Sequence, residues 1–81
     1  MIATDALTQQ ARAVVARHFR RPVDEVRLET RFVEDLGADS LDMVELAHAL
    51  EEALDVTLPE GDLDAIRTLA DVLAAAARAG S

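Results

Sequence analysis

The sequence predicts an all-α fold, a four-helix bundle with three longer helices, one short helix and a long first loop. Several segments carry apolar residues every three or four positions, which is the spacing of an amphipathic helix. No segment alternates convincingly with the period of two that a half-buried strand requires. At 81 residues the chain is long enough for one compact domain and too short for two, so residues 1–81 are expected to form a single domain.

The first helix is predicted over about residues 4–19. Its apolar stripe consists of Leu7, Ala11, Val14, Val15 and either His18 or Phe19. Pro22 forbids continuation, because the residue before a proline avoids helical backbone angles. A long loop follows, and its apolar residues are spaced as expected of a loop anchored to a core at intervals: Val26, Leu28, Phe32 and Leu36.

The second helix begins just after Gly37. Asp39 or Ser40 can cap it, and Asp42 lies in its first turn. The apolar residues at helical spacing predict a buried stripe of Leu41, Val44, Ala47, Leu50 and Leu54.

Two further helices complete the predicted bundle. Pro59 suits the start of a brief third helix that contains Leu63 and Ile66. Thr68 and Asp71 have the spacing of a capping box at the start of a last helix, which ends by Gly80. The inward face of this last helix is predicted to be Leu69, Val72, Leu73 and Ala76.

Charge is distributed very unevenly along the chain. The formal net charge is −8, from 16 acidic residues against 8 basic residues, all of them arginines. Six arginines lie within residues 12–31, whereas residues 32–66 contain no arginine or lysine and carry these carboxylates: Glu34, Asp35, Asp39, Asp42, Glu45, Glu51, Glu52, Asp55, Glu60, Asp62 and Asp64. So negative a central segment argues against nucleic-acid binding.

The sequence contains no targeting or membrane-spanning signal. Its N-terminus lacks a basic segment followed by an apolar run, and no apolar run is long enough to cross a bilayer. It also contains no cysteine, which excludes disulfides, thiolate metal sites and a protein thiol that could carry a thioester. We expect a cytoplasmic, soluble monomer with no membrane insertion.

The most informative segment is residues 32–46. Its centre, Gly37-Ala38-Asp39-Ser40-Leu41, resembles the phosphopantetheine attachment motif of the acyl carrier proteins, and the helix order and chain length resemble theirs over essentially the whole chain. The sequence Gly-Ala-Asp-Ser resembles that of freestanding fatty-acid or polyketide carriers more closely than that of peptidyl carriers. The resemblance implies covalent 4'-phosphopantetheine, taken from coenzyme A, on Ser40, with Asp39 and Leu41 beside the attachment point.

The physical chemistry of Ser40 agrees with this expectation. A serine at a helix start is exposed, and a phosphodiester on it would lie beside free backbone N–H groups and the positive end of the helix dipole. Because the chain has no cysteine, thioester chemistry needs an imported thiol, which a pantetheine arm supplies. The plainer interpretation of Ser40 is an ordinary N-cap that contributes about 1 kcal/mol.

The second helix is also the expected partner face, because it is acidic without basic residues at neighbouring helical positions. The resemblance implies that it docks basic patches on the phosphopantetheinyl transferase, acyl and malonyl transferases, ketosynthases and other synthase enzymes, with negative charge speeding the encounter. His48 stands where such carriers often have an apolar residue. The expected contact residues are Asp39, Leu41, Asp42, Val44, Glu45, His48, Glu51 and Glu52.

The acyl cargo gives a further expectation about the core. Because that core is aliphatic, an acyl chain could lie between the second helix and its neighbours. Its lining is expected from among Val14, Leu50, Leu54, Leu63, Ile66 and Leu69.

Catalysis, metal binding and scaffolding fit the sequence less well than the carrier function. A triad of Ser40, His48 and Asp39 is excluded, since eight helical residues separate His48 from Ser40 by roughly 12 Å, and His18 could reach Ser40 only through tertiary packing. Both histidines are expected to be ordinary surface or boundary residues. No EF-hand spacing occurs among the acids, so no metal site is predicted. The protein is expected not to be an enzyme. The alternative is an unmodified carrier-like regulatory or scaffold protein that binds basic partners through the second helix, and a small esterase ranks third.

Overall fold

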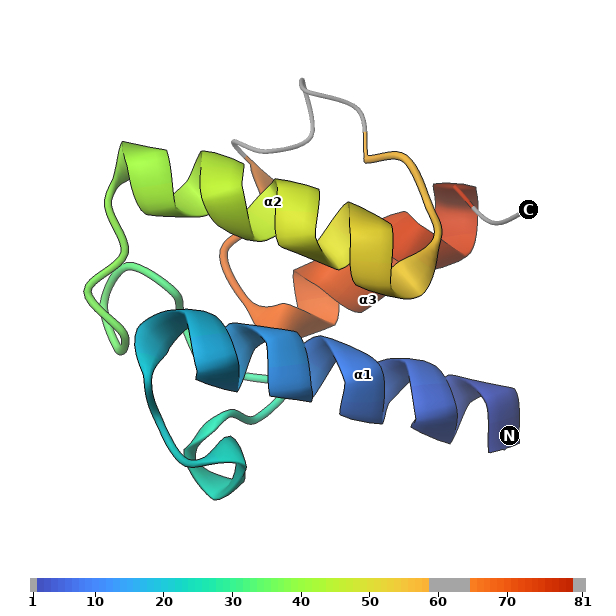
Figure 1. The fold of residues 1–81 in the computed structure, drawn as a ribbon, viewed down its shortest axis with the longest axis horizontal. Helices are drawn as coiled ribbons and strands as arrows, with labels where there is room; N and C mark the ends of the chain where they lie inside the picture. Colours follow the sequence, from blue (N-terminus) through green and yellow to red (C-terminus); the bar gives the residue numbers. More distant parts are fainter. Residues whose placement is uncertain (1, 59–64, 80–81) are drawn as a thin grey trace.

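A computed structural model describes residues 2–58 and 65–79, and these residues form a helical fold (Figure 1). The elements in order are α1 (Ile2–Phe19), a short 3-10 helix η1 (Val23–Glu25), α2 (Ser40–Leu54) and α3 (Leu69–Ala79). The described residues contain no β-strand, only one isolated bridge between Arg31 and Thr68. The prediction of an all-α fold is confirmed. None of the described helices is long and apolar enough to cross a membrane.

The helices α1 and α2 run side by side in opposite directions, and α3 packs behind them (Figure 1). The loop between α1 and α2 crosses one end of the molecule, whereas α1 begins and α3 ends at the opposite end. The end of α1 is therefore brought next to the beginning of α2. This neighbourhood contains the predicted attachment serine.

The end of α1 lies at the predicted position, and the chain leaves it through an unusual backbone conformation. Arg20 follows the helix with φ of 57°, in the left-handed region. The N–H of Arg21 donates to the carbonyl of Ala16 at 2.9 Å, which satisfies one of the last carbonyls of the helix. Pro22 then directs the chain away, as predicted.

The loop that follows is anchored partly by side chains and partly by its backbone. Val26 and Phe32 are fully buried and Leu36 is half-buried, as predicted. The prediction for Leu28 is wrong, because its side chain is 48% exposed. Its carbonyl instead accepts a hydrogen bond from the N–H of Ala70 at 2.9 Å, so the backbone makes the contact expected of the side chain.

The buried face of α2 differs from the predicted stripe in its first half. Ala47, Leu50 and Leu54 are buried as expected, but Leu41 and Val44 are 65% and 43% exposed. The buried arc near the helix start runs through half-buried Met43 and fully buried Leu46 instead. The spacing of three residues from Leu41 to Val44 and from Val44 to Ala47 is shorter than a helical turn of 3.6 residues. Each step therefore moves the side chain round the helix, and the three residues cannot share one face.

The core joins all three α-helices and the loop. In α3, Leu69, Val72 and Ala76 are buried and Leu73 is half-buried, which confirms the predicted inward face. The predicted short third helix lies largely within residues 59–64, outside the described residues, as does Leu63. Its second apolar residue, Ile66, is described: it is buried in the core but belongs to no α-helix.

Candidate functional site

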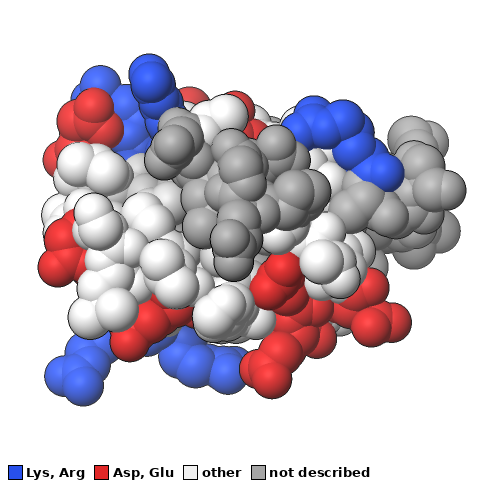
Figure 2. Space-filling view, turned by 90° about the horizontal axis from the view of Figure 1, so that it is seen from above, with Lys and Arg blue, Asp and Glu red and all other residues white. Residues whose placement is uncertain are grey.

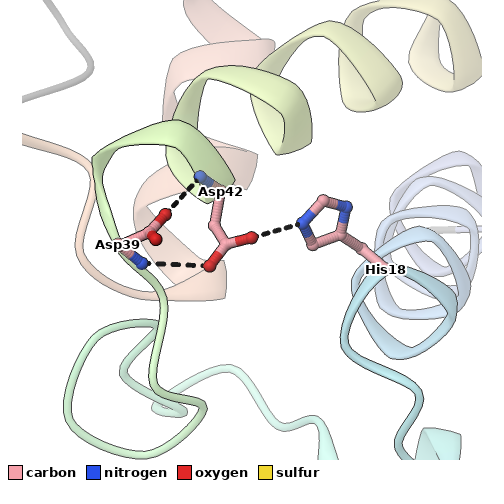
Figure 3. A network of polar contacts seen from close by, with 3 residues as sticks. All are labelled: His18, Asp39 and Asp42. Carbon is pink, nitrogen blue, oxygen red and sulfur yellow. Dashed lines mark hydrogen bonds and ion pairs between the residues drawn. The ribbon is translucent and has the colours of Figure 1, made fainter.

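Ser40 is the first residue of α2 and its side chain is exposed. The residue that caps the helix is Asp39, whose backbone is extended, with φ of −105° and ψ of −175°. An Asp39 side-chain oxygen, Oδ1, accepts the N–H of Asp42 at 2.8 Å, and Oδ2 of Asp42 accepts the N–H of Asp39 at 3.1 Å (Figure 3). Of the two predicted capping residues, the structure therefore selects Asp39.

Because Asp39 is the cap, the Ser40 hydroxyl is not used for capping. It makes no hydrogen bond to any other described residue. The plainer interpretation of Ser40 as an N-cap is wrong. An exposed hydroxyl without an internal partner is accessible to an enzyme that would modify it.

The turn before α2 depends on Gly37, whose φ of 73° lies in the left-handed region that glycine adopts at no steric cost. Its N–H donates to the carbonyl of Val33 at 3.0 Å, and the N–H of Ala38 donates to the carbonyl of Phe32 at 2.9 Å. Ala38 is buried beneath the turn, so the chain is fixed to the core two residues before Ser40. The start of α2 is thus held in place from both sides.

The structure adds His18 to this neighbourhood. Its Nε2 atom lies 3.3 Å from Oδ1 of Asp42, so the last turn of α1 contacts the first turn of α2 (Figure 3). The hydrogen bond from the Asp39 N–H and, next, the contact with His18 hold the pKa of Asp42 below its ordinary value. The sequence predicts surface or boundary positions for both histidines. His18 is half-buried at such a boundary and His48 is exposed, but the partnership of His18 with Asp42 was missed.

The residues predicted for partner binding fall into two groups. Asp39, Leu41, Val44, Glu45, His48 and Glu52 are exposed, whereas Asp42 and Glu51 are half-buried. Oε2 of Glu51 accepts the N–H of Leu58 at 2.7 Å. This bond gives an acid in the last turn of α2 a local structural role that the sequence pattern does not predict.

Figure 2 shows the face that includes α2, seen from above the view of Figure 1. Acidic side chains lie at its left margin and along its lower side, with a dense group at the lower right, and uncharged surface separates them. Arginines lie at the margins of this view. This face therefore presents both carboxylates and marginal arginines (Figure 2). On α2, the apolar side chains of Leu41 and Val44 are also exposed.

Two hollows lined by described residues adjoin α2, and neither matches the predicted acyl-chain lining as a set. A groove of about 390 Å³ between α1 and α2 includes Val14 from that set, and its lining is Val14, Arg17, His18, Ala49, Glu52 and Ala53. A core void of about 10 Å³ contacts Leu50 and Ile66 among the predicted residues. A space of that size is only about that of one water, so an acyl chain could enter there only if the helices separated.

The residues around Ser40 fit the phosphopantetheine group that the sequence resemblance implies. Ser40 and Leu41 occupy the first two positions of α2, where backbone N–H groups have no acceptor within the helix. These groups and the positive helix dipole favour a phosphodiester on Ser40. Beside Ser40, a carboxylate oxygen of Asp39 accepts the N–H of Asp42. A carboxylate oxygen of Asp42 accepts the N–H of Asp39 in return. When bound, the group supplies a thiol on a flexible tether that forms thioesters with acyl groups.

Comparison with known proteins agrees with this geometry. The family model described as the phosphopantetheine attachment site matches residues 9–76. The acyl carrier protein of Sulfurovum sp. (strain NBC37-1) is 46% identical over 68 residues, which cover 84% of this chain and 91% of the relative. That of Helicobacter hepaticus (strain ATCC 51449 / 3B1) is 44% identical over 66 residues, covering 82% and 87%. That of Borrelia garinii subsp. bavariensis (strain ATCC BAA-2496 / DSM 23469 / PBi) is 39% identical over 69 residues, covering 85% and 86%.

These matches extend over most of the chain and include the segment that presents Ser40 at the start of α2. The chain therefore belongs to the acyl carrier protein family, whose members are non-catalytic carriers that bear 4'-phosphopantetheine.

Proposed function

We propose that Ser40 is the residue that receives 4'-phosphopantetheine and that the loaded protein carries acyl intermediates among the enzymes of fatty-acid or polyketide biosynthesis. The observation that carries this proposal is the state of the Ser40 side chain. It is exposed at the first position of α2, and its hydroxyl is free because Asp39 performs the capping. Asp39 and Leu41 flank the attachment point, one fixing the helix start and the other offering an exposed apolar surface.

The partner face is proposed to combine free carboxylates with exposed apolar side chains. Glu45 and Glu52 are exposed and have no described hydrogen-bond partner, so their charges are available to basic patches on another protein. Leu41 and Val44 supply apolar area beside Ser40. Asp42 and Glu51 contribute charge while they also hold the fold together. His48, exposed on the same helix, adds a polar contact.

This combination suits a carrier that must visit several enzymes in turn. Long-range attraction raises the rate of encounter, and exposed ion pairs add little to the affinity, so complexes release readily. The proposed partners are the phosphopantetheinyl transferase, acyl and malonyl transferases, ketosynthases and other synthase enzymes with basic docking surfaces.

The proposal also covers the organisation of the chain. Residues 1–81 act as a single carrier domain and a monomer, and a short helix between α2 and α3 completes a four-helix bundle. The cytoplasm is the proposed compartment, because the thiol of the arm must stay reduced to form thioesters, and disulfides are disfavoured there.

Intact-mass analysis tests the attachment residue directly. The chain contains two serines, Ser40 and Ser81, so Ser81→Ala is a matched control for Ser40→Ala. After incubation with coenzyme A and a phosphopantetheinyl transferase, we expect the wild type and Ser81→Ala to gain the mass of one arm and Ser40→Ala to gain none. A wild-type chain that stays bare would favour the unmodified scaffold, and modification of Ser40→Ala would place the arm elsewhere.

The pathway is tested by the cargo. Mass spectrometry of the carrier purified from its native host is expected to find saturated or β-oxidised acyl groups on the arm. Cargo that consists of amino acids would contradict the assignment to fatty-acid or polyketide synthesis.

A further inference from the structure

We propose that His18, Asp42 and Glu45 form a binding site for a divalent transition-metal ion, best matched by Zn²⁺, at the junction of α1 and α2. One ligand atom from each residue can be chosen so that all three lie within 4.8 Å of one another. His18 comes from the last turn of α1, whereas Asp42 and Glu45 are three residues apart on α2 and so lie on the same side of that helix. The site thus joins two elements that are distant in the sequence.

The contact between His18 and Asp42 already has the geometry of two zinc ligands. Zinc binds imidazole nitrogen and carboxylate oxygen at about 2.0–2.2 Å, so two ligands of a tetrahedral site lie roughly 3.4 Å apart. The observed distance from Nε2 of His18 to Oδ1 of Asp42 is 3.3 Å. An ion could therefore bind both atoms at their present separation, once the two side chains turn toward it and it takes the place of the proton shared in their hydrogen bond.

Glu45 completes the set from the solvent side. Its side chain is exposed and has no hydrogen bond to a described residue, so it is free to rotate and reduce the 4.8 Å separation. Three protein ligands with the fourth position open to water is an arrangement that zinc sites adopt.

Contacts around the ligands hold two of them in place. Oδ2 of Asp42 accepts the N–H of Asp39 at 3.1 Å, which directs Oδ1 toward His18 (Figure 3). The ring of His18 packs edge-on against Phe19, with ring centroids 4.8 Å apart and an interplanar angle of 76°. Hydrogen bonds of this kind, made by a ligand away from the metal, contribute tenfold or more to the affinity of metal sites.

The imidazole decides which ion is bound. Carboxylates and water alone suit Mg²⁺ and Ca²⁺, whereas an imidazole nitrogen favours Zn²⁺ and other first-row transition metals. The other histidine, His48, belongs to no such group of ligands among the described residues. The selectivity for Zn²⁺ over Mg²⁺ therefore depends on His18.

Isothermal titration of the full, untagged chain with Zn²⁺ tests the site. We expect one saturable equivalent for the wild type, binding at least tenfold weaker for His18→Gln, and unchanged binding for His48→Gln. Glutamine keeps a donor for Asp42, and His48→Gln removes an exposed histidine of the same helix. Equal binding by wild type and His18→Gln, or no saturable binding at all, would overturn the proposal.

A second measurement needs only the wild-type chain. In NMR spectra, the ring signals of His18 are expected to shift on addition of one equivalent of Zn²⁺, whereas those of His48 stay unchanged. A hundredfold excess of Mg²⁺ should not reverse the shift of His18. Equal shifts at both histidines, or reversal by Mg²⁺, would mean that the ion binds the acidic surface without a site, which contradicts the proposal.

Discussion

The helices α2 and α3 begin in almost the same way, yet only α2 leaves its first residue exposed. At the start of α2, Asp39 and Asp42 exchange hydrogen bonds between side chains and backbone N–H groups. At the start of α3, Oγ1 of Thr68 accepts the N–H of Asp71 at 3.3 Å, and Oδ2 of Asp71 accepts the N–H of Thr68 at 3.1 Å. Both are capping boxes, as the spacing of Thr68 and Asp71 predicted for the second.

What differs is the residue that follows each cap. Ser40 follows Asp39 and is exposed, whereas Leu69 follows Thr68 and is fully buried. The N–H of Ala70 donates to the carbonyl of Leu28, so the second start is also covered by the loop. A capping box is therefore common to both helix starts, but only the start of α2 leaves its first residue exposed, as the attachment proposed for Ser40 requires.

The largest effect on stability is expected from Leu69→Ala. Truncating a fully buried leucine removes apolar contacts and leaves a cavity, so the free energy of unfolding should fall by about 2–5 kcal/mol. The matched change after the other cap, Ser40→Ala, removes an exposed hydroxyl without an internal partner and should change stability by less than about 0.5 kcal/mol. Urea denaturation of both variants measures the contrast, and similar losses would refute it.

A smaller and equal effect is expected from removing either cap. Asp39→Ala and Thr68→Ala each leave a helix N–H without its side-chain acceptor, which costs about 1 kcal/mol. Urea denaturation of the two variants should give losses that agree within the error of the measurement. If Asp39→Ala cost much more than Thr68→Ala, the two boxes would not be equivalent, and the start of α2 would depend on contacts beyond its cap.

Acidification should reduce the stability that both capping boxes contribute, without abolishing either of them. The backbone N–H of Asp39 lowers the pKa of Asp42, and that of Arg67, followed by Thr68, lowers the pKa of Asp71. An aspartate carboxyl has a pKa of about 3.9 in the unfolded chain, and a carboxyl whose pKa is lower in the folded state stabilises the protein at any pH above that value. This contribution to stability is lost as the pH falls through the lower pKa of the folded state.

The free energy of unfolding should therefore decrease as the pH drops from about 5 to below about 4, and it should decrease less in Asp42→Asn and Asp71→Asn. Carbon-detected NMR titration of the aspartate carboxyls, together with denaturation at each pH, measures both quantities. Asp42 and Asp71 carboxyls that titrated at the ordinary value for aspartate would contradict this account.

The sequence was sufficient wherever a local rule decides the structure. Pro22 marked the exit from α1, Thr68 and Asp71 marked the start of α3, and Gly37 marked the turn before Ser40. The motif around Ser40 also identified the family that the comparisons show. Such features depend on residues only a few positions apart.

The sequence was insufficient where the outcome depends on tertiary packing. The contact between His18 and Asp42 joins residues 24 positions apart and requires α1 and α2 to pack in opposite directions. The helical period shows that Leu41, Val44 and Ala47 cannot share one face, but it does not say which of them is buried, and in the structure that residue is Ala47, beside Leu46. Leu28 is exposed for a similar reason, since the backbone of the loop makes the contact with α3. Helical spacing alone specifies none of these.

The smallest effect on stability, and the sharpest test of what the exposed start of α2 is for, is expected from Leu41→Ala. Since Leu41 is 65% exposed, its truncation should change the free energy of unfolding by less than about 0.5 kcal/mol. If the residue belongs to the partner face, the same variant should be modified by the transferase with a lower kcat/KM. Leu28→Ala is the control, because Leu28 is also exposed but lies in the loop. Equal rates for both variants and the wild type would show that exposed apolar area at the start of α2 plays no part in recognition by the transferase, and docking would then depend on charges such as Glu45.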